Sequence, residues 1–257
     1  MKIESSVITY IGLVRDNNED NYYINGKYKK DNKVAIEGYY DTAHREAYLY
    51  AVCDGMGGER AGEMASLIAV ETLAQYQSTD IRRTITGYIQ NANKLICDEI
   101  ERNNGVRSGT TLALLYIRDN KATAYNIGDS RIYFFRDGDL YLMSEDHTEA
   151  QRLVRMGVIS QEEAATHKSR NMLTQHLGIF PDEMVIEPFL SEEVKLKKND
   201  IILLCSDGLT DMVSDDEIAD ILWKRDINTT DLVKELAAAT QANGSRDNVT
   251  ILVVKVV

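Results

Sequence analysis

The sequence predicts an α+β fold in which antiparallel strands form blocks and helices lie between those blocks. Two observations predict this class. Apolar or β-branched runs follow one another through short polar turns, such as residues 118–120 and 136–139, and such short connections imply antiparallel pairing. Helical patterns separate groups of strands and do not follow every strand, so the chain lacks the strict alternation of a parallel βαβ fold.

The individual elements follow from composition and periodicity. Apolar or β-branched runs predict strands at about residues 6–13, 47–53, 109–117, 121–127, 130–135, 201–205 and 248–257. Helical spacing and favourable composition predict helices at about residues 59–77, 81–102, 146–156, 215–224 and 229–242.

Two local features define the first and last of these helices. Within 59–77, apolar residues recur at positions i, i+3, i+4 and i+7, which predicts that this face is buried. The residues on that face are Ala61, Met64, Ala65 and Ile68. The pair Thr230-Asp231 is a suitable N-cap for the last helix, because the side-chain oxygens of both residue types can accept a hydrogen bond from a free backbone N–H group.

Composition and charge argue against some binding partners and indicate how the chain is organised. The chain has 257 residues, of which 44% are hydrophobic, and a formal net charge of −12. An acidic surface argues against binding to nucleic acid or to anionic lipid. The chain has two prolines and lacks a Ser/Gly-rich linker, so we expect one domain over residues 1–257. No heptad pattern demands assembly, and we expect a monomer.

The same sequence predicts a cytoplasmic protein. No apolar run approaches membrane-spanning length, and the N-terminus lacks the pattern of a signal peptide. The three cysteines, Cys53, Cys97 and Cys205, form neither an even framework nor a Cys-x-x-Cys motif. Because Cys53 and Cys205 lie in apolar runs, we expect buried free thiols, which suit a reducing compartment.

Acidic residues stand where several predicted core strands meet turns. They are Asp54, Asp129, Asp207, Asp247 and the pair Glu19-Asp20. One such residue is an ordinary turn former, but several carboxylates at one sheet edge would repel one another unless cations neutralise them. The cluster has no evident His or Cys partner that would act as a ligand, so Mg²⁺ or Mn²⁺ fits better than Zn²⁺. Gly55 lacks a Cβ, which would let a backbone carbonyl approach an ion.

Two other interpretations of these segments fail. Residues 16–27 begin like a calcium loop, but Asn21 replaces the required glycine and Lys27 replaces the bidentate acid. The glycine-rich residues 55–58 lack the spacing of either a dinucleotide-binding or a P-loop fingerprint.

Taken together, six segments resemble the metal-dependent type 2C protein phosphatases, in the order found in that family. They are GLVRDNNED (12–20), VCDGMGGERAGEMAS (52–66), SGTTLALL (108–115), NIGDSRIY (126–133), LLCSDGLTDMVSDDEI (203–218) and SRDNVTILVV (245–254). Residues 153–178 are similar to the flap segment of bacterial members. The resemblance implies a four-layer αββα sandwich of two antiparallel sheets flanked by helices, with a small flap at about residues 150–180.

The resemblance also implies a metal centre. In the family, two Mn²⁺ or Mg²⁺ ions share a bridging water that attacks phosphorus in line. Asp54 resembles the bridging carboxylate and Gly55 the carbonyl ligand. Asp207 and Asp247 resemble the other carboxylate ligands, and Asp129 with Asp207 resembles the pair that holds a possible third ion.

Further residues are implied around that centre. Glu19 and Asp20 match an acidic pair that supports the site through metal-bound water or from the second shell. Arg15 matches the arginine that binds the substrate phosphate, which gives Arg15, Asp54 and Asp207 the catalytic roles. Asn248 is next to a proposed ligand, so we expect it to orient the site.

Three departures from the family pattern affect the expected proton donor, the flap and one connection. Met56 stands where many eukaryotic members have a histidine proton donor, so a metal-bound water is the expected donor; His147 is expected to be structural. Lys168 replaces a proline that often follows the histidine at 167, which affects the rigidity of the flap. The connection 26–46 is longer than in bacterial relatives and is either a surface hairpin or a solvated insertion, with the insertion expected.

These observations predict an enzyme that hydrolyses phosphoserine and phosphothreonine on proteins and opposes a bacterial Ser/Thr kinase. Its expected partners are phosphoprotein substrates and that kinase. Two alternatives stay open. One is a catalytically silent metal-binding module of the same fold, and the other is a hydrolase of small phosphate esters.

Overall fold

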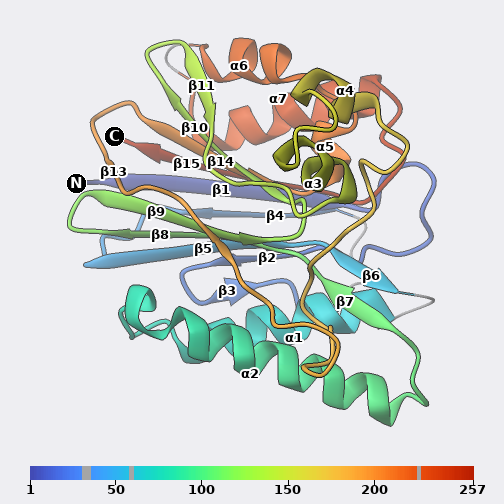
Figure 1. Ribbon diagram of the computed structural model, residues 1–257. Coiled ribbons are helices and arrows are strands. Elements are labelled where there is room, and N and C mark those ends of the chain that lie inside the picture. The colour runs from blue at the N-terminus through green and yellow to red at the C-terminus, as the bar shows by residue number, and fades with distance from the viewer. Residues whose placement is uncertain (31–35, 58–60, 225–226) are drawn as a thin grey trace.

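A computed structural model describes residues 1–30, 36–57, 61–224 and 227–257. Its strands form two large antiparallel sheets that lie face to face (Figure 1). The six-stranded sheet has the order β11 (Asp139–Leu142), β10 (Arg131–Arg136), β14 (Ile201–Cys205), β15 (Val249–Val256), β1 (Ile3–Tyr10) and β4 (Ile36–Asp41).

The second sheet contains seven strands. Its order is β12 (Phe189–Leu190), β9 (Lys121–Ile127), β8 (Leu112–Arg118), β5 (Ala47–Cys53), β2 (Asn21–Ile24) and β3 (Lys27–Tyr28), and β13 (Val194–Lys195) also pairs with β9. A separate two-stranded ribbon pairs β6 (Gly55–Gly57) with β7 (Ser108–Thr110).

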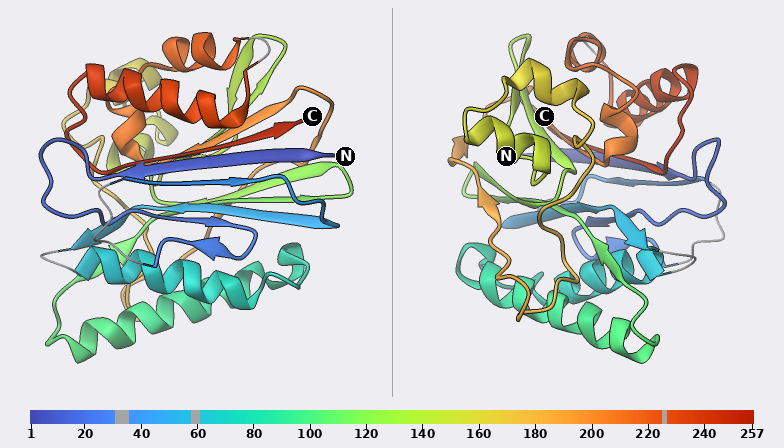
Figure 2. Two further views of the ribbon diagram at one scale, coloured as in Figure 1. Left: turned by 180° about the vertical axis from the view of Figure 1, so that it is seen from behind. Right: turned by 45° about the vertical axis from the view of Figure 1, so that its right-hand side comes forward.

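Helices cover both outer faces of this sandwich (Figure 2). The seven-stranded sheet is covered by α1 (Ala61–Gln75) and α2 (Ile81–Arg102). The six-stranded sheet is covered by α5 (Asp207–Thr210), α6 (Asp215–Leu222) and α7 (Thr229–Ala242). Two short helices, α3 (Glu149–Arg155) and α4 (Gln161–Thr166), belong to the predicted flap. The predicted four-layer α+β sandwich is therefore confirmed.

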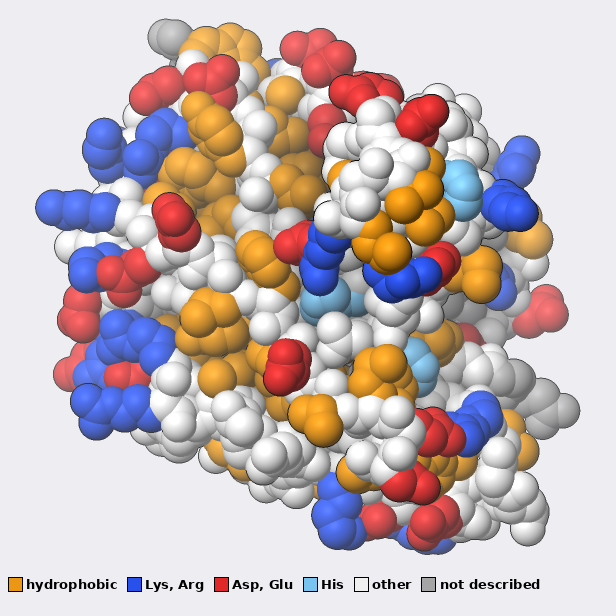
Figure 3. All heavy atoms as spheres, viewed as in Figure 1, with side chains coloured by type: hydrophobic (Ala, Val, Ile, Leu, Met, Phe, Trp, Pro, Cys, Tyr) orange, Lys and Arg blue, Asp and Glu red, His pale blue; other side chains and the backbone are white. Residues whose placement is uncertain are grey.

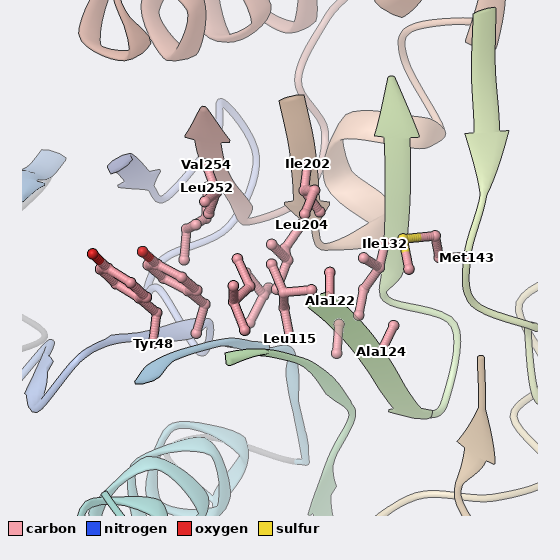
Figure 4. Close-up of a cluster of buried hydrophobic side chains, with 14 of the residues drawn as sticks. Tyr48, Leu115, Ala122, Ala124, Ile132, Met143, Ile202, Leu204, Leu252 and Val254 are labelled. Carbon is pink, nitrogen blue, oxygen red and sulfur yellow. The ribbon is translucent and has the colours of Figure 1, made fainter. Parts of the chain in front are cut away.

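Three hydrophobic clusters hold the four layers together. Between the sheets, Tyr48 and Leu115 of one sheet lie opposite Leu204 and Leu252 of the other (Figure 4). The other two clusters lie between each sheet and its helices. Burying a Leu or Ile side chain stabilises the fold by about 1.5–3 kcal/mol. In the described parts of the chain, no helix combines the length and apolar character needed to cross a bilayer.

Two local predictions were wrong. The buried face of α1 is built mainly from small residues, Gly62, Ala65, Ser66 and Ala69 among them, whereas Met64 is 42% exposed. Small residues are required there because α1 begins against the backbone at Gly55. The N-cap of α7 is Asn228, whose side chain accepts a hydrogen bond from the backbone of Asp231; Thr230-Asp231 lies in the first turn.

The long connection 26–46 is not a wholly solvated insertion in its described parts. Residues 27–28 form β3, and residues 36–41 form β4, an edge strand paired with β1. Lys29 is only 1% exposed. Residues 31–35 lie outside the described part of the chain. The two strands within this segment thus extend the two sheets.

Candidate metal centre and active site

The predicted acidic residues lie at one end of the sandwich, where β5 runs into β6 (Figure 1). Asp54 directly follows β5, and Asp129 follows β9 after the turn at Gly128. Asp207 is the first residue of α5 after β14, and Asp247 precedes β15 by two residues. Each of these buried strands therefore has one carboxylate near its end, at the same end of the sandwich.

Electrostatic coupling shows that these groups are close in space. Burial raises the pKa of Asp54 well above its ordinary value, and the negative charges of Asp20, Asp207, Asp129 and Asp247 raise it further. Repulsion of this kind between carboxylates is strong only at short range in a poorly solvated site. The structure thus brings together five acidic residues that span most of the sequence.

Asp20 is held rigidly at the base of this cluster. Its side chain is fully buried, and Oδ2 accepts hydrogen bonds of 2.8 Å from both Ser206 Oγ and Thr250 Oγ1. Burial raises its pKa to about 6, although these hydrogen bonds and the charge of Lys29 act in the opposite direction. Its other oxygen, Oδ1, has no hydrogen-bond partner.

Asp129 lies beside the flap. Burial raises its pKa to about 7, with a further contribution from the charge of Asp146, which Arg131 binds through both carboxylate oxygens. A pocket of about 160 Å³ joins Asp129 and Asp207 to Arg170 and other residues of the flap.

The backbone around Gly55 is packed too tightly for any other residue. A Cβ at this position would lie 2.2 Å from the carbonyl oxygen of Gly62 and 2.5 Å from that of Glu19. The preceding residue is fixed as well, because the carbonyl oxygen of Asp54 accepts hydrogen bonds of 2.9 Å from Thr111 N and Thr110 Oγ1. Glycine is therefore a steric requirement here because of the neighbouring backbone. The approach of its carbonyl group to an ion stays a prediction.

Arg15 lies on the loop between β1 and β2 and contacts the proposed ligand Asp247. Its Nε and Nη2 donate hydrogen bonds of 2.7 and 2.6 Å to the two carboxylate oxygens. Both residues line an open pocket of about 990 Å³ together with Glu19 and Arg246. A phosphate group entering this pocket would meet the guanidinium at its rim.

Asn248 joins the two segments that carry these residues. Its Oδ1 accepts a hydrogen bond of 2.8 Å from the backbone N–H of Glu19, and its Nδ2 donates to the carbonyl oxygens of Ile11 and Asn17. Three backbone groups of the β1–β2 loop are thereby fixed to the start of β15.

The donors present fit hard divalent cations. Oδ1 of Asp207 is buried without a hydrogen-bond partner, as is Oδ1 of Asp20, and an unpaired buried carboxylate oxygen is costly unless a cation or water satisfies it. Within the described residues, no three His, Cys, Asp or Glu side chains already converge on one point as ligands. Mg²⁺ and similar ions tolerate this, because they retain several waters and take few protein ligands.

Other polar or reactive groups near the site have structural partners. His147 Nδ1 accepts a hydrogen bond of 3.1 Å from the backbone N–H of Gly128, which supports the turn before Asp129. Cys53 and Cys205 are buried free thiols, and burial raises the pKa of Cys205 to about 12. Neither cysteine is placed to act as a nucleophile.

Comparison with known proteins identifies the family of this chain. The model of the family described as Protein phosphatase 2C matches residues 15–249, which include all of the acidic residues discussed above. The chain belongs to the protein phosphatase 2C family. The predicted enzyme class, a protein serine/threonine phosphatase, is confirmed by this membership and by the relatives that follow.

The relatives cover almost the whole chain. A "Putative protein phosphatase 2C-type" of Streptococcus pyogenes is 36% identical over 99% of this chain and 97% of its own length. A "Serine/threonine phosphatase stp" of Listeria welshimeri is 35% identical over 95% and 92%. The solved phosphatase PstP/Ppp of Mycobacterium tuberculosis has a TM-score of 0.82 at 31% identity and covers 100% and 99%.

One solved neighbour bears on the metals. The catalytic domain of a phosphatase named PstP, described as a complex with 2 manganese ions, has a TM-score of 0.80 at 31% identity and covers 100% of this chain and 99% of its own. The 2C family is metal-dependent, and the donors at the strand ends of this chain suit that dependence.

The sequence analysis did not identify the residues that form hydrogen bonds to Asp20 and to the backbone next to it. Ser206 and Thr250 bind Asp20, and Lys29 donates a hydrogen bond of 2.8 Å to the carbonyl oxygen of Asn18. The two hydroxyl residues lie within segments that carry the family resemblance, so proximity to Asp207 and Asp247 could have indicated them. No pattern in residues 26–30 indicates a buried lysine.

Proposed function

We propose that this phosphatase removes phosphate from phosphoserine and phosphothreonine side chains of proteins in a reaction that depends on Mn²⁺ or Mg²⁺. The proposal is supported by the electrostatic effect of the strand-end carboxylates on one another: burial and the negative charges of Asp20, Asp129, Asp207 and Asp247 all raise the pKa of Asp54. Such a cluster is electrostatically unfavourable alone and becomes favourable when cations bind.

The roles of individual residues are part of the proposal. Asp54, the carbonyl group of Gly55, Asp207 and Asp247 would hold two ions, and Asp129 with Asp207 would hold a third. Bound divalent cations would lower the pKa of a shared water and stabilise charge on the phosphoryl oxygens.

The protein's own groups position the substrate. Arg15 would bind two phosphate oxygens through its guanidinium, a bidentate geometry that it already makes with Asp247. Glu19 and Asp20 would support the ions through bound water and not as direct ligands, and Asn248 would hold the loop that carries Arg15 next to Asp247.

The proposal includes a Ser/Thr kinase as the source of the substrate, because a phosphoester on a protein hydroxyl must be made by a phosphoryl-transfer reaction. It also includes a cytoplasmic location, which the three unpaired cysteines favour. A monomer remains the expected state.

Hydrolysis of a phosphothreonine peptide with Mn²⁺, and after its removal with EDTA, tests this function. Asp207→Ala should abolish turnover, whereas Asp216→Ala, which removes an exposed carboxylate on α6, should retain it. Activity in EDTA would contradict the metal dependence. Full activity of Asp54→Asn would contradict the assigned roles, and faster turnover of nucleotides than of phosphopeptides would favour a small-ester hydrolase.

A further inference from the structure

Arg246 lies at the rim of the same pocket as Arg15 and has no assigned role. It directly precedes Asp247, and both arginines line the pocket of about 990 Å³ that also contains Asp247, one of the proposed metal ligands. The side chain of Arg246 is exposed. A second cation is thereby available to a substrate whose phosphate is bound by the first.

Arg246 is unusual among the arginines that the structure describes. Most of them form an ion pair with an Asp or Glu side chain, and Arg83 and Arg246 are the two that do not. This is notable because the chain has a net charge of −12, and because Asp16, Glu19 and Asp247 line the same pocket. An unpaired guanidinium is free to bind an incoming anion.

The backbone on both sides of Arg246 is fixed, so the side chain starts from a defined place. The N–H of Leu13 donates a hydrogen bond of 2.8 Å to the carbonyl oxygen of Ser245. The backbone of Ser245 has a φ of 30°, a conformation that few residues other than glycine adopt. Gly12 packs against the next peptide, where a Cβ would lie 2.1 Å from the carbonyl oxygen of Asp247. These contacts join the loop of Arg246 to the loop of Arg15.

Basic side chains also gather away from the pocket that contains Arg15 and Arg246. On the face shown in Figure 3, Lys and Arg side chains along the left edge lie among Asp and Glu side chains. A separate pocket of about 510 Å³ shares no residue with the pocket of Arg246 and is lined by Arg136, Lys197, Lys198, Lys224 and Lys255. Binding of an acidic substrate would depend on individual cations at the pocket rim, because long-range attraction by an acidic protein is unfavourable.

We infer that Arg246 is a specificity-determining residue that binds a second anionic group on the substrate, next to the phosphoserine or phosphothreonine. The inference rests on the proposed function and deepens it. The preferred substrate class is a phosphopeptide with a further negative charge beside the scissile phosphate, supplied by a second phosphate or by a Glu or Asp side chain. A guanidinium binds both groups through paired N–H donors.

The experiment uses three peptides of one sequence, each with a single scissile phosphothreonine. Its neighbours are neutral in the first peptide and glutamate in the second, and the third carries an additional non-hydrolysable phosphonate analogue of phosphoserine. The selectivity ratio is kcat/KM for each acidic peptide divided by kcat/KM for the neutral one, measured with Mn²⁺ at low ionic strength. Hydrolysis of the neutral peptide by the wild-type protein tests the proposed function separately.

Arg246→Gln should lower the selectivity ratio about fivefold, because KM for the acidic peptides should rise. An exposed charge pair contributes up to about 1 kcal/mol, which corresponds to about a fivefold change. Arg246→Lys should retain part of the ratio, and Arg246→Glu should lower it further than glutamine does. Arg83→Gln is the matched control, because it removes the other exposed, unpaired arginine from the start of α2, and it should leave the ratio at the wild-type value.

Binding provides a second readout without turnover. Fluorescence anisotropy with labelled, non-hydrolysable phosphonate versions of the same peptides should show the same fall in selectivity for Arg246→Gln. A fall for both acidic peptides, or for the one with the additional phosphonate alone, supports the inference and identifies the anionic group. An unchanged ratio, or an equal loss on all three peptides, overturns it.

Discussion

Arg15 and Asp247 are separated by 232 positions in the sequence, and their side chains are joined by two hydrogen bonds of 2.6 and 2.7 Å. Both side chains remain accessible to solvent, with 55% and 38% of their surface exposed. The pair links the loop that we assign to phosphate binding with a carboxylate that we assign to metal binding. A change at either residue should therefore affect the other.

Arg15→Ala should lower kcat/KM for a phosphothreonine peptide by about tenfold or more, because the bidentate contact to phosphate is lost. Arg15→Lys should recover only a small part, since an ammonium group cannot make two parallel hydrogen bonds. Isothermal titration calorimetry should show that Mn²⁺ binds Arg15→Ala at least as tightly as the wild type, because a competing positive charge has been removed. Weaker Mn²⁺ binding would contradict the assigned division of roles.

Gly55→Ala should destabilise the protein by about 2–4 kcal/mol, since the new methyl group would overlap the carbonyl oxygens of Gly62 and Glu19. Urea denaturation of the metal-free protein measures this effect. Gly87→Ala in α2 is the control: the nearest atom to its Cβ would be Tyr76 Oη at 3.8 Å, and the helix should gain up to about 1 kcal/mol. Equal stability of both variants would show that Gly55 is not sterically constrained.

Chemical labelling tests the burial of the thiols. Iodoacetamide at pH 8 should leave Cys53 and Cys205 unmodified in the folded protein, and should leave phosphatase activity intact, because both thiols are buried and burial raises their pKa values. In urea both should react, which mass spectrometry of the digested protein would show. Rapid labelling in the native state with loss of activity would point to a cysteine nucleophile.

The long apolar elements could be predicted from the sequence, whereas the short edge elements could not. Residues 201–205 are a continuous apolar run, and residues 249–256 are largely apolar, because both strands lie between a neighbouring sheet and a layer of helices. In contrast, β4 carries glutamate, glycine and aspartate at an edge, and its pairing with β1 decides its conformation. Helix α4 has no apolar period, and its capping box at Ser160 defines its start.

The acidic cluster was predictable because antiparallel strands of one sandwich share two ends, so that carboxylates at equivalent ends must meet. The hydrogen bonds that hold the acidic side chains in place were not predictable. The hydrogen bonds of Asp20 to Ser206 and Thr250 depend on the packing of β2 beneath the opposite sheet, and the pairing of Arg15 with Asp247 depends on a loop. Such contacts follow from tertiary structure and leave no local periodicity.

The raised pKa values of the acidic cluster predict how the stability of the metal-free protein depends on pH. The ordinary value for an aspartate is 3.8, and in the folded protein the values are about 7 for Asp129 and about 6 for Asp20. At pH values between the ordinary pKa and these raised pKa values, the folded protein binds more protons than the unfolded chain. The free energy of unfolding should therefore fall as the pH rises from about 4 to about 7, where Asp20 and Asp129 ionise in the folded protein.

Thermal unfolding in EDTA at pH 5 and pH 8 measures this slope. Asp129→Asn carries no charge at either pH, so it should flatten the slope and stabilise the protein at pH 8 by about 2 kcal/mol, whereas Asp216→Asn on the exposed face of α6 should not. Mn²⁺ should also flatten the slope, because bound cations stabilise the ionised carboxylates. A metal-free protein that becomes more stable from pH 5 to pH 8 would show that these carboxylates do not repel one another in the fold.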